Sequence, residues 1–163
     1  MLDKKKSPYD RLNELVNIKL HEDPVAAGLD KINEIIANIS NNSSEVTRFF
    51  NKVIDLLTNI KVQKDVKRRS IKIKIRGLLQ TDEEVRKGKS KDERVFVAES
   101  KLAEDFKELG ILEDKMTRAL AFREVVENAQ QELRMKKQQL GKQIDLIRQQ
   151  IELGVLSGEW FRK

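Results

Sequence analysis

Apolar residues recur at intervals of three and four along most of the chain, the spacing that lines up one face of an α-helix. Val25, Ile32 and Ile39 belong to one such row. The only prolines are Pro8 and Pro24, so no later residue breaks a helix by ring clash. The pattern predicts an all-α protein.

Each proline follows a residue, Ser or Asp, that caps helix N-termini well, so a helix is expected to begin at both places. The run SNNSS at Ser40–Ser44 is rich in residues that favour turns and predicts a loop. We therefore expect an N-terminal helical pair over residues 1–43 and a basic helix over residues 44–79.

The stretch KDVKRRSIKIKIRG at residues 64–77 is compatible with two structures. Ile71, Ile73 and Ile75 alternate with basic residues, as they would in a half-buried β-strand. In a helix, Ile71 and Ile75 continue the preceding apolar face, whereas Ile73 falls on the opposite side. We favour the helix over the strand, because no second alternating segment offers a partner strand.

Residues 80–90 predict a polar turn. Capping-box patterns begin at Thr81 and at Ser90, where a Ser or Thr is followed three residues later by Glu. Beyond this turn we expect one long helix over residues 91–153, about 95 Å in length at about 1.5 Å per residue. The remaining residues, 154–163, form a predicted tail.

A heptad repeat runs through the long helix. One position is apolar from Ala98 to Ile147 except at Asp105. The companion position turns polar at Arg123, Gln130 and Lys137. Either neighbouring apolar residues carry the packing there, or these polar residues fix the oligomeric state.

Such a helix must pack against other helices or other copies of the chain. We predict an extended helical hairpin or coiled-coil-like bundle that is oligomeric, with one long C-terminal helix. The residues predicted to mediate self-association are Leu112, Met116, Val126, Leu133, Leu140, Ile144, Ile147 and Ile151. The single tryptophan, Trp160, lies in the tail. It is expected either to form a local packing cap or to be part of a docking segment.

The net charge of +6 is concentrated in one place. Residues 64–77 hold seven basic residues and one acid, Asp65, so this segment alone carries +6. A solvated helix face is the ordinary reading of a charge run, but the lack of acids within it favours a polyanion partner. The predicted nucleic-acid-binding residues are Lys61, Lys64, Lys67, Arg68, Arg69, Lys72, Lys74 and Arg76, of which Lys61, Lys64, Arg68, Lys72 and Arg76 form one row on the helix.

Catalytic and metal-binding patterns are not evident. The chain has no cysteine, one histidine and no glycine-rich phosphate loop. We expect no enzymatic activity, no cofactor and no metal site. No apolar run reaches the about 20 residues of a membrane span, and the N-terminus does not resemble a signal peptide. We therefore expect a cytoplasmic protein without a membrane partner.

From about Lys61 onward, the order of features resembles the phage recombination mediators of the UvsY family. A basic helical segment, KVQKDVKRRSIKIKIRG, leads through a polar turn to a start of the form S-x-D-E at Ser90. A long helix follows, with Val126, Ala129 and Leu133 in the matching run. In place of the aromatic residues that follow the basic segment in that family, this chain has two leucines.

The resemblance implies a ring-like homo-oligomer that binds single-stranded DNA. It also implies that the protein helps a RecA-like recombinase to displace the single-strand binding protein, in the host cytoplasm if a phage encodes the chain. Lys67, Arg68, Lys72, Lys74 and Arg76 would then contact the DNA. The alternative is a structural or adaptor coiled-coil protein, such as a virion or scaffold component.

Overall fold

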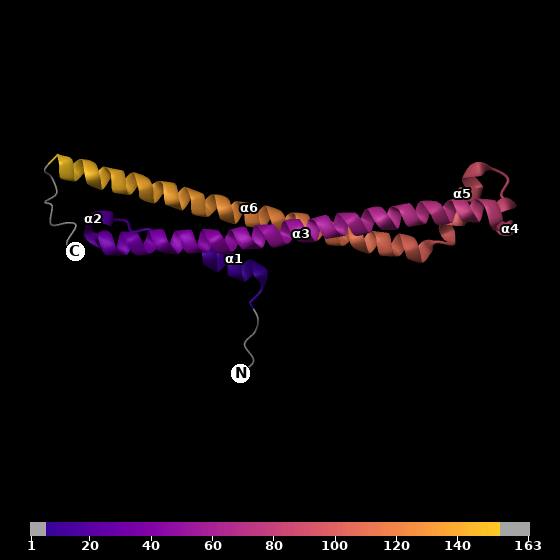
Figure 1. Cartoon of the computed structure of the whole chain (residues 1–163), viewed down its shortest axis with the longest axis horizontal. Helices are drawn as coiled ribbons and strands as arrows, with labels where there is room; N and C mark the ends of the chain where they lie inside the picture. Colours follow the sequence, from indigo (N-terminus) through magenta and orange to yellow (C-terminus); the bar gives the residue numbers. More distant parts are fainter. Residues whose placement is uncertain (1–5, 154–163) are drawn as a thin grey trace, which may run out of the picture. The chain divides into compact units, whose positions relative to one another are not determined.

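The computed structural model describes residues 6–153, and within this range it is entirely helical apart from short connections (Figure 1). The helices are α1 (Pro8–Val16), α2 (Pro24–Ala27), α3 (Leu29–Thr81), α4 (Glu83–Arg86), α5 (Lys91–Ser100) and α6 (Ala103–Glu152). The prediction of an all-α protein is confirmed. The predicted tail with Trp160 lies outside the described residues.

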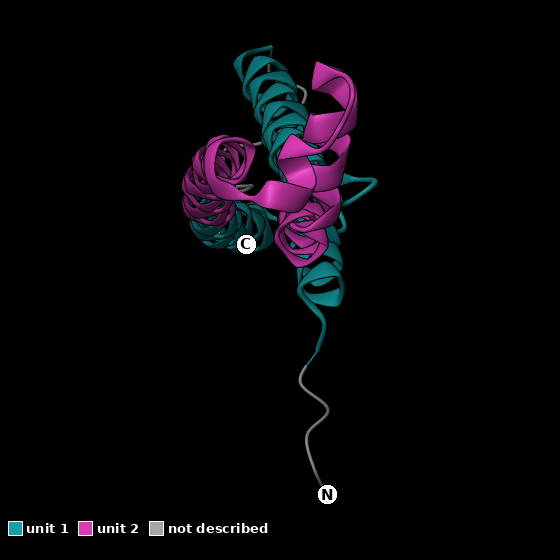
Figure 2. Ribbon diagram, turned by 90° about the vertical axis from the view of Figure 1, so that its right-hand side faces the viewer, with its two compact units in different colours: residues 1–52, 123–163 teal, residues 53–122 magenta. Residues whose placement is uncertain are grey.

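The chain divides into two compact units (Figure 2). Unit 1 comprises Met1–Lys52 and Arg123–Lys163, and unit 2 comprises Val53–Phe122. The first part of α3 and the last part of α6 therefore belong to unit 1. The last part of α3, the first part of α6, and α4 and α5 belong to unit 2.

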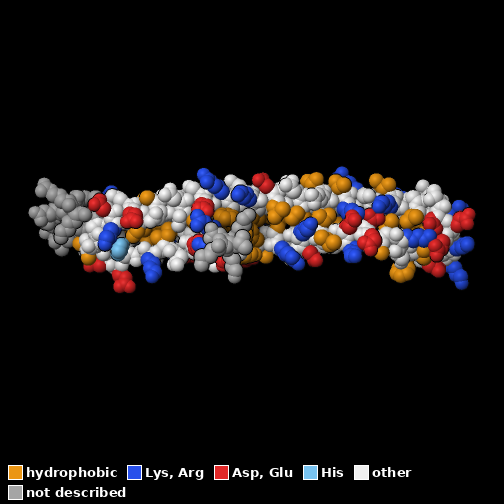
Figure 3. All heavy atoms as spheres, turned by 90° about the horizontal axis from the view of Figure 1, so that it is seen from below, with side chains coloured by type: hydrophobic (Ala, Val, Ile, Leu, Met, Phe, Trp, Pro, Cys, Tyr) orange, Lys and Arg blue, Asp and Glu red, His pale blue; other side chains and the backbone are white. Residues whose placement is uncertain are grey.

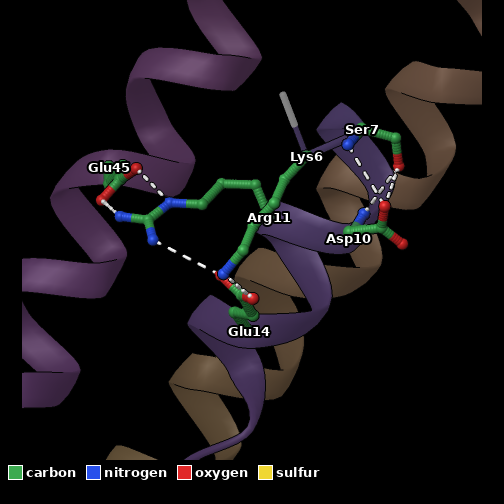
Figure 4. A network of polar contacts seen from close by, with 6 residues as sticks. All are labelled: Lys6, Ser7, Asp10, Arg11, Glu14 and Glu45. Carbon is green, nitrogen blue, oxygen red and sulfur yellow. Dashed lines mark hydrogen bonds and ion pairs between the residues drawn. The ribbon is translucent and has the colours of Figure 1, made fainter. Parts of the chain in front are cut away.

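In unit 1, α1 is capped and attached to α3 by charged side chains (Figure 4). Ser7 and Asp10 form the reciprocal hydrogen bonds of a capping box. Arg11 donates two hydrogen bonds to the Glu45 carboxylate, at 2.9 and 3.0 Å, and also lies 3.5 Å from Glu14. The predicted helix start at Ser7 is confirmed.

The predicted loop at Ser40–Ser44 is wrong, because α3 continues through it. The polar side chains there find acceptors without leaving the helix. The Ser43 hydroxyl donates to the Ile39 carbonyl at 2.7 Å, and the Asn42 amide donates to the Leu15 carbonyl of α1 at 2.7 Å. Burial of Ile39 and Val46 on either side holds the segment in helical conformation.

The apolar core of unit 1 joins α3 to α6. Ile32, Ile35 and Ile39 of α3 pack with Leu140 and Ile147 of α6, and all five are buried. Both sets follow the three-and-four spacing found in the sequence. The helical rows that were predicted separately are therefore two sides of one interface.

In unit 2, α3 and α6 run antiparallel. Lys74 contacts Asp105, and Lys64, which precedes Lys74 on α3, contacts Met116, which follows Asp105 on α6. The connection contains α4, whose N-cap is Asp82 rather than the predicted Thr81. It also contains α5, which the predicted residue Ser90 caps by accepting a hydrogen bond from the Glu93 backbone N–H at 3.1 Å.

The predicted single helix over 91–153 is interrupted at Lys101 and Leu102. The Leu102 N–H donates to the Glu99 carbonyl at 2.9 Å, an i to i−3 bond that forms a tight turn between α5 and α6. Lys101 also forms ion pairs with Asp82 and Glu84 at 2.8 and 2.7 Å. These contacts fix the turn against the start of α4.

Burial follows the predicted heptad position closely. Ala98, Ala119, Val126, Leu133, Leu140 and Ile147 are all buried. Four of the predicted self-association residues, Val126, Leu133, Leu140 and Ile147, are thus covered within their own chain and cannot contact a second copy in this conformation. The other four, Leu112, Met116, Ile144 and Ile151, are half-buried.

Candidate nucleic-acid interface

The basic stretch forms the last part of α3, so the strand alternative for residues 71–76 is wrong. Ile71 is 4% exposed and faces the interior of unit 2, whereas Ile73 is 68% exposed. The helix therefore presents Ile73 to solvent, as the helical interpretation required. The alternation of Ile and Lys does not indicate a strand here. The chain follows the helical spacing of Ile71 and Ile75, and the two-residue alternation has no structural counterpart.

Two of the predicted interface lysines bind one carboxylate from α6. The Lys67 ammonium donates to Asp105 Oδ1 at 2.7 Å, and Lys74 donates to both Asp105 oxygens at 2.8 Å. Lys67 also pairs with Glu108. Asp105 was the one polar residue at an otherwise apolar heptad position. Its side chain is 14% exposed, and its charge is balanced there by an ion pair with Lys67.

Two further residues of the predicted row face α6. Arg68 donates to Glu113 at 2.6 Å, and Lys64 lies with its ammonium 3.4 Å from the Met116 sulfur. The expectation that acids were lacking is therefore wrong for Lys67, Arg68 and Lys74, because α6 supplies acids that are distant in sequence. The predicted row does not form as one outward line.

Hydrogen bonds from Lys67, and next from Lys74, hold the pKa of the Asp105 carboxyl below its ordinary value of 3.8. The same contact with Asp105, followed by that with Glu108, raises the pKa of Lys67 above 10.5. Asp105 and Lys67 are therefore both charged at neutral pH. Their ion pair attaches α3 to α6 in unit 2.

We expect Asp105→Asn to lower the free energy of unfolding at neutral pH, because the two ammonium groups lose their shared counter-charge. A carboxylate whose pKa is lowered on folding contributes stability that is fully present above its ordinary pKa of 3.8. That contribution disappears as the pH falls through the lowered, folded-state value. Urea unfolding over a pH series should show the variant and the wild type converging in acid.

Asp114→Asn is the matched control, since Asp114 is an exposed carboxylate on α6 without an ion pair among the described residues. It should unfold like the wild type across the series. A deficit in Asp105→Asn that stays constant into strong acid would contradict the assignment of its effect to charge.

Five predicted basic residues have no ion pair within residues 6–153; Lys64 is half-buried beside Met116, and the other four are exposed. We call these four exposed residues the cationic row: Lys61, Arg69, Lys72 and Arg76. Their spacings of eight, three and four residues place them along one side of α3. Asp65 lies between the first two, so the row with this acid has a net charge of +3.

Apolar side chains flank the cationic row. Val62, Val66 and Ile73 are 56%, 60% and 68% exposed, and their spacing of four and seven residues puts them on an adjacent strip of α3. Hydrophobic side chains reach the surface between charged ones on the face shown in Figure 3. The charged segment therefore does not form a uniformly polar surface.

On the other side of the cationic row lies a shallow hollow, which we call the aromatic recess. It is lined by Arg68, Ile71, Lys72, Ile75, Glu99, Phe106 and Leu109. The sequence analysis found two leucines where aromatic residues would follow the basic segment and so missed Phe106. The signal that could have found it is the heptad phase, which places the start of α6 opposite the basic part of α3.

The polar positions Arg123, Gln130 and Lys137 lie in unit 1. Val126, Ala129 and Leu133 beside them are buried, which supports the interpretation that neighbouring apolar residues carry the packing. The Arg123 guanidinium donates to Glu127 of its own helix at 2.8 Å. Gln130 lines an open polar hollow with side chains from α3, including Ser43 and Thr47.

Among residues 6–153, no group of three or more His, Asp or Glu side chains could hold a metal ion. No helix in that range has the length and hydrophobicity to cross a bilayer. Fold and surface together define an all-α protein with a cationic helix face. Comparison with protein-family models, curated proteins and solved structures gave no significant match.

Proposed function

We propose that the protein is a non-enzymatic accessory factor that binds single-stranded DNA through the cationic row. The observation that carries the proposal is four exposed basic residues on one side of α3 without an ion pair in the described chain. Like charges three and four residues apart destabilise an isolated helix by a few tenths of a kcal/mol per pair. A phosphate backbone would supply the counter-charges.

The paired and unpaired basic residues have different roles in this proposal. Lys67 and Lys74 attach α3 to Asp105, so they position the helix and contribute little net charge. Lys61, Arg69, Lys72 and Arg76 remain available to phosphates. Contacts to phosphates do not depend on sequence and weaken as salt rises.

The resemblance to UvsY-type mediators extends the proposal to a biological role. In that role the protein would load a RecA-like recombinase onto DNA covered by single-strand binding protein, in the cytoplasm. The cationic row supports only the DNA-binding part of this role. The recombinase and the single-strand binding protein enter as partners through the sequence resemblance.

Titration of a fluorescently labelled single-stranded oligonucleotide at low salt tests the proposed function. We expect saturable binding and an unchanged helical circular dichroism spectrum. Absence of binding at micromolar protein, in the range of ordinary non-specific affinities, would refute the function.

We also propose that the protein self-associates through the outward face of α6 in unit 1. Met135, Leu146 and Leu153 are 51%, 59% and 79% exposed, and spacings of eleven and seven residues place them on one face. Gln139 and Gln150, on the same side, carry no charge, whereas Lys142, four residues before Leu146, places one exposed positive charge on this face. Two copies would therefore meet through the three apolar side chains, with Lys142 directed to the edge of the contact.

Leu146→Lys should shift the protein towards the monomer, because it places a charge in the centre of this apolar face. Light scattering would show a lower mass than for the wild type at the same concentration. Val66→Lys is the control, since Val66 is equally exposed, at 60%, but lies on α3 in unit 2. A monomeric wild type, or an unchanged mass for Leu146→Lys, would contradict this interface.

A further inference from the structure

The aromatic recess lies within unit 2, where α3, α5 and α6 each contribute side chains. Its floor is apolar: Ile71 is 4% exposed, and Ile75 and Leu109 are half-buried. Phe106 is 38% exposed, an unusual degree for an aromatic side chain beside a core. The recess therefore offers an aromatic surface that the chain itself leaves partly uncovered.

The rim of the recess is charged. Lys72 belongs both to the rim and to the cationic row, and it has no ion pair in the described chain. Arg68 is the second basic rim residue and is paired with Glu113. Glu99 of α5 supplies a carboxylate. One recess thus combines an apolar floor, a free cation and a hydrogen-bond acceptor.

We propose that the aromatic recess binds one nucleobase of the strand that the cationic row holds by its phosphates. This inference rests on the proposed function and deepens it. Phe106 would stack on the base, and Lys72 would hold the adjoining phosphate. The Glu99 carboxylate would accept a hydrogen bond from a base amino group, as acidic side chains do from cytosine.

The recess gives the protein a means of distinguishing a single strand from a duplex. Phosphates are present in both, so the cationic row alone cannot make the distinction. In a duplex the bases are paired and stacked, and extracting one costs a few kcal/mol. A single strand presents its bases freely, and stacking on an aromatic side chain contributes about 1–3 kcal/mol per base.

The test uses two variants of Phe106 in the full chain. Phe106→Leu keeps an apolar side chain over Ile71 and Leu109 but removes the aromatic face, whereas Phe106→Tyr keeps that face. We expect Phe106→Leu to lower the affinity for a single-stranded oligonucleotide about tenfold, within the range for loss of one stacked base. Duplex affinity should not change, and Phe106→Tyr should bind both like the wild type.

A second strand completes the experiment: an oligonucleotide of the same length with abasic sites, which keeps every phosphate. The wild type should bind it more weakly than the normal strand. In Phe106→Leu the two strands should differ less in affinity. The variant has already lost the stacking energy, so removing the base takes away little more. The comparison is a double-mutant cycle between Phe106 and the bases.

Three outcomes would overturn the recess while leaving the proposed function intact. They are an unchanged affinity in Phe106→Leu, an equal loss for single strand and duplex, and additive effects of the variant and the abasic strand. A wild type that binds no oligonucleotide would instead refute the proposed function itself. Circular dichroism of both variants must match the wild type. If Phe106→Leu fails to fold, the wild type's affinities for the normal and the abasic strand carry the test, and equal affinities would overturn the recess.

Discussion

Replacing the whole cationic row with glutamine should lower the affinity for single-stranded DNA by about 10²–10³-fold at about 0.1 M salt. The variant carries Lys61→Gln, Arg69→Gln, Lys72→Gln and Arg76→Gln. Each phosphate contact to a single strand contributes about 0.7 to the slope of log affinity against log salt. Each contact therefore raises the affinity at about 0.1 M salt about fivefold over the affinity at about 1 M. Fluorescence anisotropy with a labelled oligonucleotide measures the change.

A second variant with the same change of charge is the control. Lys115, Arg118, Arg134 and Arg148 are exposed on α6 and have no ion pair among the described residues. Their replacement by glutamine should change the affinity much less. Equal losses in the two variants would show that net charge, and not the cationic row, determines binding. Neither variant removes an ion pair or a buried side chain, so both should fold.

The largest expected effect on stability comes from Leu140→Ala. Leu140 is 3% exposed and packs with Ile32, Ile35 and Ile39 of α3 in the core of unit 1. Truncating a buried leucine costs about 2–5 kcal/mol through lost burial and the cavity left behind. Urea unfolding followed by far-ultraviolet circular dichroism should show this loss of about 2–5 kcal/mol.

Leu56→Ala makes the same chemical change at a position that is 50% exposed. It should cost about 0.5 kcal/mol or less, as exposed substitutions usually do. Similar losses at the two positions would contradict the helix pairing of unit 1. Loss of structure in Leu140→Ala with a normal Leu56→Ala would agree with it.

The heptad repeat carried most of the information about the fold. Ala119, Val126, Leu133 and Ile147 were placed at one position from spacing alone, and all are buried. The pattern works because the side of a helix that packs against another helix must be apolar over its full length. The exception at Asp105 was visible in the sequence, but its partners were not.

What could not be predicted depends on contacts between residues far apart in the chain. Lys67 and Asp105 are 38 positions apart, so no local pattern shows that they pair. The same holds for Phe106, which antiparallel pairing brings to the basic part of α3. The error at Ser40–Ser44 has another cause. Turn preference is weak where side chains such as Ser43 can bond to the helix backbone and flanking residues are buried.

The sequence therefore located the charged segment correctly but could not separate its two kinds of residue. The basic residues that face α6 form ion pairs or contact Met116, and those on the outer side do not. Only helix packing makes this distinction. On this basis the proposed interface keeps only the four residues of the cationic row from the eight predicted basic residues, and the proposed recess adds Phe106 beside Lys72.

The most direct test of the central claim is the salt dependence of single-stranded DNA binding by the wild-type protein. Four phosphate contacts predict a slope of about −3 for log affinity against log salt, and the glutamine variant of the cationic row should bring that slope close to zero. A slope near zero in the wild type, or one that the variant leaves unchanged, would contradict binding through the cationic row.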